Sequence, residues 1–336
     1  MISSVGVGAT SAGGTGTLYI DKTDDNYGLG ENITFHADAE DNIALGADAL
    51  NSTTGVATYN IGIGTYALTD LTDGDKNIAI GVNAGANITA ASSNVIIGHE
   101  AADGAITQDG TIAIGSSALG ALTTGANNLA IGNAVMASIT AGSNNIAVGA
   151  FALDAQVGDG SNASTAGHYN IAIGTAAMGD INTHSNSGSV LDKNIAIGTD
   201  ALKGASFAGA DINVESNIAI GHQAMDATLA NAQTGTIAIG DSALGALTGG
   251  AGNIAIGYEA LDAEDTGDYN TAIGYQSLSA LNYDGSGYNT AVGYHTLRVC
   301  SSGIENVAVG GNAGLLLQTG IQNVIVGNGA GTATVD

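Results

Sequence analysis

The side chains that catalyse reactions or bind metals in proteins are scattered along this chain. Its six histidines lack the close spacing of metal ligands, and no serine lies in the strand–turn–helix context of a nucleophile motif. The densest glycine run of the repeat region, residues 248–252, lacks the lysine of a phosphate-binding loop. We therefore expect no enzyme, no catalytic residue and no cofactor. The histidines are His36, His99, His168, His184, His222 and His295.

Calcium is the one ion that the acidic turns could hold. Asp73, Gly74 and Asp75 stand together, and Asp159 is followed by Gly160. Asp and Gly are also the usual residues of tight turns, which explains both segments with fewer assumptions. We assign no metal ligand, and calcium at the Asp-rich turns stays a minor alternative.

The charge balance excludes whole classes of partner. The chain carries 31 acidic and five basic residues, a formal net charge of −26. Nucleic-acid binding needs clustered Lys and Arg that replace counterions, and anionic membranes attract the same residues. No run of eighteen apolar residues could span a bilayer, and the first thirty residues show no secretory signal. We expect no nucleic-acid partner and no membrane insertion.

Three tyrosines are the clearest candidates for contact with a receptor. Tyr258, Tyr275 and Tyr294 occupy one position of successive repeats. Tyrosine combines an apolar ring with a polar tip, which suits it to interfaces. A stack that only stabilises the fold is the alternative interpretation.

A repeat must position all of these side chains. The segment Asn-Ile-Ala-Ile-Gly, or a near copy, occurs sixteen times, in most places every seventeen residues. A period this short is typical of the coils of a stacked solenoid. The first residue is Asn except at Thr111 and Thr236, and stacked amides can form a hydrogen-bonded ladder. The predicted ladder comprises Asn42, Asn60, Asn77, Asn94, Asn128, Asn145, Asn170, Asn194, Asn217, Asn253, Asn270, Asn289, Asn306 and Asn323.

Positions within a coil are numbered from this Asn as zero. Position three is always aliphatic, and position one is aliphatic except at Thr271 and Thr290. Because strand side chains alternate between two faces, we expect both positions to face the core. Position two, which is small in nearly every coil, would then face outwards and let another chain approach, or simply be a neutral flat strand. The predicted chain–chain interface comprises Ala79, Ala113, Ala130, Ala147, Ala172, Ala196, Ala219, Ala238 and Ala255.

The remaining positions complete the coil. Position four is Gly in every copy, which indicates a corner, and positions seven and eight favour Ala-Leu or Ala-Met, which supply a second apolar wall. Cys300 falls at position eleven, where other coils have Leu, and we expect it to be buried.

The sequence predicts an all-β chain. Residues 1–41 form an entry segment with degenerate coils, and residues 42–336 form a β-solenoid, giving about 16–18 coils with a basic period of 17 residues. Three consecutive coils of 25, 24 and 23 residues predict long loops at 150–169, 175–193 and 199–216. Such loops often bind ligands, and tolerated surface insertion explains them equally well.

These coils resemble the head repeats of trimeric autotransporter adhesins and are similar to repeat segments of phage tail fibres and related virion appendages. The resemblance covers about residues 42–327. It places residues 77–81, Asn-Ile-Ala-Ile-Gly, at the family's repeat positions, and likewise the matching residues of each copy. It implies a left-handed β-roll, with three rolls packed in parallel around one axis. The period is slightly longer than in the adhesins, and their secretion signal, heptad stalk and C-terminal membrane barrel are not seen, which favours a virion fibre or a standalone extracellular filament.

We therefore expect a non-enzymatic structural protein. It would be the rigid homotrimeric shaft or adhesive segment of a phage tail fibre or similar virion appendage, on a virion or extracellular surface, in contact with a host glycan or protein. The alternative is a self-assembling extracellular filament or surface adhesin subunit that stacks head to tail. A monomeric ice- or mineral-binding rod ranks last, because its regular Thr grid is missing.

Overall fold

The computed structural model describes residues 41–53, 56–154, 167–181, 190–204, 213–227 and 233–332. The chain divides into two compact units, Met1–His36 and Ala37–Asp336. The predicted entry segment and its degenerate coils lie outside the described residues, apart from Asp41.

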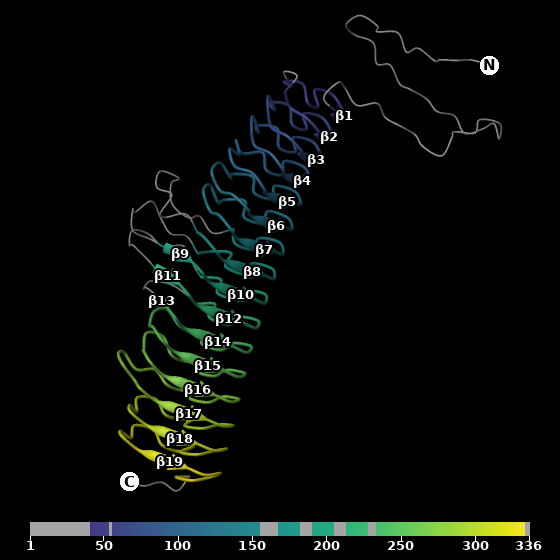
Figure 1. Cartoon of the computed structure of the whole chain (residues 1–336). Coiled ribbons are helices and arrows are strands. Elements are labelled where there is room, and N and C mark those ends of the chain that lie inside the picture. The colour runs from purple at the N-terminus through teal and green to yellow at the C-terminus, as the bar shows by residue number, and fades with distance from the viewer. Residues whose placement is uncertain are drawn as a thin grey trace, which may run out of the picture. The chain divides into compact units, whose positions relative to one another are not determined.

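The second unit is a parallel β-solenoid, which confirms the predicted all-β solenoid (Figure 1). One three-residue strand per coil joins a sixteen-stranded parallel sheet, and the residues that the structure describes contain no helix. The sheet comprises β1 (Ile43–Leu45), β2 (Ile61–Ile63), β3 (Ile78–Ile80), β4 (Val95–Ile97), β5 (Ile112–Ile114), β6 (Leu129–Ile131), β7 (Ile146–Val148), β8 (Ile171–Ile173), β10 (Ile195–Ile197), β12 (Ile218–Ile220), β14 (Ile237–Ile239), β15 (Ile254–Ile256), β16 (Thr271–Ile273), β17 (Thr290–Val292), β18 (Val307–Val309) and β19 (Val324–Val326).

The longer coils leave the register of this sheet unchanged. Ile171 pairs with Ile195, and Ile195 with Ile218, although these residues are 24 and 23 positions apart. On the return side, the same region adds a three-stranded parallel sheet of β9 (Val190–Asp192), β11 (Asn213–Glu215) and β13 (Gln233–Thr234). The extra length is therefore accommodated away from the main sheet.

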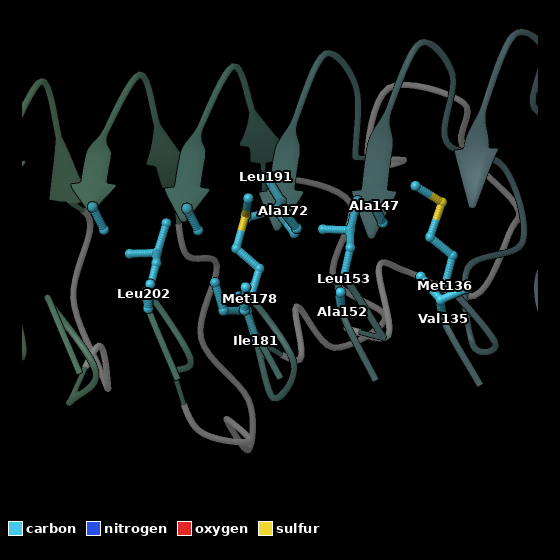
Figure 2. Packing of buried hydrophobic residues seen from close by; sticks show 14 of the residues in the cluster. Val135, Met136, Ala147, Ala152, Leu153, Ala172, Met178, Ile181, Leu191 and Leu202 are labelled. Atoms are coloured by element: carbon cyan, nitrogen blue, oxygen red, sulfur yellow. The ribbon is translucent and has the colours of Figure 1, made fainter. Parts of the chain in front are cut away.

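The interior is built from position two and position eight, so the predicted direction of the strand faces is wrong. Figure 2 shows Ala147 and Ala172 on the inner side of their strands, opposite Leu153 and Met178. All four are fully buried. The alanines predicted to form a chain–chain interface are fully buried inside the coil and cannot face another chain: Ala79, Ala113, Ala130, Ala147, Ala172, Ala196, Ala219, Ala238 and Ala255.

The reason for this orientation is the width of the coil. The strand lies so close to the return wall that an ideal Cβ on Gly62 would meet Leu50 Cγ at 3.1 Å. Ile96 fits at position two only beside Gly85, where a Cβ would lie 2.9 Å from Ile96 Cδ1. Ile325 likewise lies against Gly314 and Gly331. A large residue at position two thus requires a glycine on the opposite wall.

Gly at position four has two physical causes. In Gly98 the φ angle is +144°, a conformation that strains any residue with a Cβ. A Cβ there would also collide with the Gly115 carbonyl of the next coil. Both features recur from coil to coil, which explains why no other residue occupies this corner.

The buried asparagine column holds successive coils together. The Asn60 backbone N–H donates to Asn42 Oδ1 at 2.8 Å, and the Asn60 amide Nδ2 donates to the Gly74 carbonyl of its own return wall at 2.9 Å. Asn77 repeats both contacts with Asn60 and Ala91. The side chain therefore joins neighbouring coils and also the two walls of one coil. Most members are fully buried, whereas Asn323 in the last coil is half-buried.

Two threonines interrupt this column. The hydroxyls of Thr111 and Thr236 are buried without a hydrogen-bond partner. Their backbone N–H groups still donate to Asn94 and Asn217, but the hydroxyl reaches neither the return wall nor the next coil.

Restoring the amide should stabilise the solenoid. We expect Thr111→Asn to gain about 1–2 kcal/mol, because it satisfies a buried polar position and gives the Asn128 N–H an acceptor. The midpoint of chemical unfolding measures the change, with the reverse substitution Asn145→Thr as the matched control, which should lose a similar amount. A lower midpoint for Thr111→Asn would contradict the ladder's role.

Candidate interaction surface

Positions one and three of every strand point away from the core. Together they form the aliphatic stripe, which runs the full length of the main sheet and in which no side chain is buried. Ile80 is 37% exposed and Val309 is 38% exposed, although both are large apolar residues. The stripe consists of Ile43, Leu45, Ile61, Ile63, Ile78, Ile80, Val95, Ile97, Ile112, Ile114, Leu129, Ile131, Ile146, Val148, Ile171, Ile173, Ile195, Ile197, Ile218, Ile220, Ile237, Ile239, Ile254, Ile256, Ile273, Val292, Val307, Val309, Val324 and Val326, with Thr271 and Thr290 completing the rows.

Sequence reasoning placed these residues in the core, yet two signals pointed outwards. Asn at position zero lies on the same strand face as position two, so an internal Asn ladder requires that small residues face inwards. The pairing of Ile96 with Gly85 in adjacent coils is the second signal, since size compensation occurs between residues in contact.

The predicted tyrosine column is present and exposed. Tyr258 stacks on Tyr275 with ring centroids 5.0 Å apart, and Tyr275 stacks on Tyr294 at 5.6 Å. A hydrogen bond to the Glu259 carboxylate raises the pKa of Tyr258 to about 12. Gln276 Nε2 donates to the same carboxylate at 2.6 Å, which ties two coils together.

A second tyrosine pair was missed from the sequence. Tyr269 and Tyr288 precede the Asn of successive coils, and their rings stack at 5.4 Å with an angle of 8° between the planes. The two tyrosine sets thus flank the outward-facing positions of β16 and β17, where Thr271 and Thr290 replace the usual Ile. The sequence signal for this pair was that each tyrosine stands directly before the Asn of its coil, Asn270 or Asn289.

The acidic turn residues accept hydrogen bonds within the fold. Asp75 Oδ1 accepts from the Thr58 backbone N–H at 2.8 Å and from its hydroxyl at 2.9 Å, and these bonds lower the pKa of Asp75. Asp109 accepts in the same way from the Ser92 N–H at 2.7 Å. Within the part of the chain that the structure describes, no three His, Cys, Asp or Glu side chains gather as metal ligands would. Asp159 and Gly160 lie outside that part.

The four histidines that the structure describes are not brought together. His99 lies 3.7 Å from its neighbour Glu100, and His222 lies 3.6 Å from Asp241. His168 Nδ1 accepts from the Ser143 N–H, and His295 stacks on Tyr294 at 3.7 Å. His36 and His184 lie outside the described residues. Cys300 is buried as expected, and burial raises the pKa of its thiol.

The predicted long loops at 150–169, 175–193 and 199–216 are described only in part. Their described ends carry ion pairs between neighbouring coils: Lys193 Nζ lies 2.8 Å from Glu215 Oε1, and Lys203 Nζ lies 3.8 Å from Asp180 Oδ2. Such exposed pairs contribute little to stability.

One carboxylate lies inside the solenoid. Glu264 is fully buried at position eleven, in the column where neighbouring coils have Leu247 and Leu281. Its Oε1 accepts from the Gly267 N–H at 2.7 Å, while Oε2 has no partner. Burial raises the pKa of Glu264 to about 7. The sequence carried this signal, because an acid replaces an aliphatic residue in a core column.

The chain should therefore lose stability as Glu264 ionises. The carboxyl has its ordinary pKa of 4.5 when unfolded and about 7 when folded. The penalty is absent below about pH 4.5, grows between these values, and reaches about 3 kcal/mol above pH 7. Glu264→Gln should flatten this part of the profile of unfolding free energy against pH, whereas Glu305→Gln, at an exposed site, should leave it unchanged. Equal profiles for wild type and Glu264→Gln would contradict this assignment.

Comparisons with protein-family models, curated proteins and solved structures give no match. Over the described residues, no helix has the length and apolar character needed to cross a membrane.

Proposed function

We propose that this chain is a non-enzymatic structural fibre protein, the rigid shaft or adhesive segment of a phage tail fibre or similar virion appendage. In this proposal three copies pack in parallel around one axis, with their aliphatic stripes facing one another. The single observation that carries the proposal is the row of partly exposed apolar residues that runs along all sixteen strands and is interrupted only at Thr271 and Thr290. The stripe replaces the alanine column as the proposed contact between chains.

The size of the stripe supports an interface between chains. Sixteen strands at a spacing of ~4.8 Å give a length of roughly 75 Å, and two outward rows are about 10 Å wide, which makes roughly 750 Å². Exposed apolar patches on monomers rarely exceed ~300–600 Å². A stable interface buries about 800 Å² per partner, so the stripe alone comes close to this area.

The identity of the partner follows from the repeat. A surface that repeats at every strand spacing is matched in length and spacing by a second copy of itself in parallel register. The number three and the virion setting come from the resemblance to adhesin heads and tail fibres. Light scattering would then give three times 32.7 kDa, or 98.1 kDa, and polymers that grow with concentration would favour a head-to-tail filament instead.

Charges placed in the stripe should separate the chains. We expect Ile114→Glu with Ile239→Glu to give a 32.7 kDa species that remains folded, because association would bury unpaired carboxylates. The matched control is Ser117→Glu with Ser242→Glu, at position six, where Glu100 and Glu259 occur naturally. A wild-type monomer, or a stripe variant with unchanged mass, would sink the proposal.

Tyr258, Tyr275 and Tyr294 are the proposed contacts with a host surface. If they bind sugars, replacement of all three by Ser should abolish binding to a glycan array while circular dichroism stays unchanged. Replacement of Tyr59, Tyr66 and Tyr169 by Ser is the control, because these three are also exposed but belong to neither tyrosine stack. Equal binding by the two triple variants would remove the column from the proposed contact.

A further inference from the structure

The five exposed tyrosines near β15–β17 have an arrangement that also has consequences for redox chemistry. Each ring lies beside a ring of the next coil, at centroid distances of 5.0, 5.4 and 5.6 Å. In a biaryl, the centroids are separated by two ring radii and one C–C bond, which is shorter than these distances by less than a bond length. The rings of each pair lie face to face, so coupling requires that they close and turn until an ortho carbon of one ring meets an ortho carbon of the next.

The environment of the rings permits this movement and the loss of a proton. Tyr258, Tyr275 and Tyr294 are 41%, 45% and 53% exposed, so both an oxidant and solvent can reach them. The phenol of Tyr258 is hydrogen-bonded to the Glu259 carboxylate, which is a proton acceptor in place before oxidation. The backbone holds the partners in register, because Tyr275 and Tyr294 extend from strands that pair residue by residue.

We propose that the Tyr258–Tyr275–Tyr294 column and the Tyr269–Tyr288 pair are sites of oxidative coupling, at which hydrogen peroxide, acting through a haem peroxidase, joins neighbouring coils by dityrosine bonds. Each phenol loses one electron and one proton to give a phenoxyl radical. Two radicals form a C–C bond between ortho carbons, and the hydrogens on those carbons move to the oxygens. The two electrons and two protons convert one peroxide to two waters.

The consequence is a covalent link between coils of one chain. Such a link constrains the unfolded chain as a disulfide does, in a protein whose single cysteine is buried. The coupling is a property of one chain and is independent of the proposed trimer.

The test is oxidation of the purified full-length chain with hydrogen peroxide and a haem peroxidase. We expect dityrosine fluorescence, an intact mass lower by two hydrogens per link, and no multiple of 32.7 kDa on a denaturing gel. Trypsin cannot map the links, because no Lys or Arg lies between Lys203 and Arg298. A protease specific for acidic residues separates the partners, since Glu259 lies between Tyr258 and Tyr275, and Asp284 lies between Tyr275 and Tyr294.

Phenylalanine variants remove the phenol hydroxyl while they keep the aromatic ring. Tyr275→Phe with Tyr288→Phe keeps every ring and every stack but leaves no two tyrosines stacked among the described residues, so coupling within the column and the pair should be lost. Tyr275→Phe alone should leave only the link between Tyr269 and Tyr288. Equal dityrosine in the double variant, links at Tyr59, Tyr66 or Tyr169, or links only between chains would each overturn the proposal.

Discussion

Each coil that begins with Asn is joined to its neighbouring coils through backbone hydrogen bonds and through the Asn amide. The Asn77 backbone N–H donates to Asn60 Oδ1, and Asn77 Oδ1 accepts from the Asn94 backbone N–H. The Asn77 amide Nδ2 donates to the Ala91 carbonyl on the return wall. A shift of one residue along the chain would break this column and turn the strand faces over. Register is therefore the constraint on which the remaining features depend, and even coils of 24 and 23 residues return to it.

Register and a narrow interior together decide which side chains face outwards. With the amide column inside, position two must also face inwards, and only Ala or Gly fits there unless the opposite wall has Gly. The larger aliphatic residues then have no place in the core and form the exposed stripe. Because the coils are stacked, the rings of Tyr258 and Tyr275 lie about one strand spacing apart. The same stacking places Glu264 in a buried column of apolar residues. One repeating geometry thus accounts for the surface candidates and for the buried acid.

The features that depend on the period of the repeat could be predicted from the sequence. The orientation of the strand faces, which depends on the size of the side chains inside the coil, was predicted wrongly. Seventeen-residue spacing indicated the solenoid, its short strands and the glycine corners, and the recurring Asn indicated the column. The recurrence of aliphatic residues at positions one and three was interpreted as core, because burial is the common cause of such a pattern. The width of a coil is not visible in periodicity, but Ile96 opposite Gly85 and Ile325 opposite Gly314 carried that information. The Tyr269–Tyr288 pair needed the position before each Asn to be compared across coils.

In the proposed assembly Ile239 faces another copy of the chain, whereas its neighbour Ala238 is buried in the core. The most direct measurement compares Ile239→Cys with Ala238→Cys under a short bismaleimide, in a background where Cys300 is buried. The expected result is covalent multimers of the chain for the cysteine at 239, and no reaction of the cysteine at 238 until the protein is unfolded. Multimers linked through 238, or a cysteine at 239 that reacts freely but never joins two chains, would contradict it.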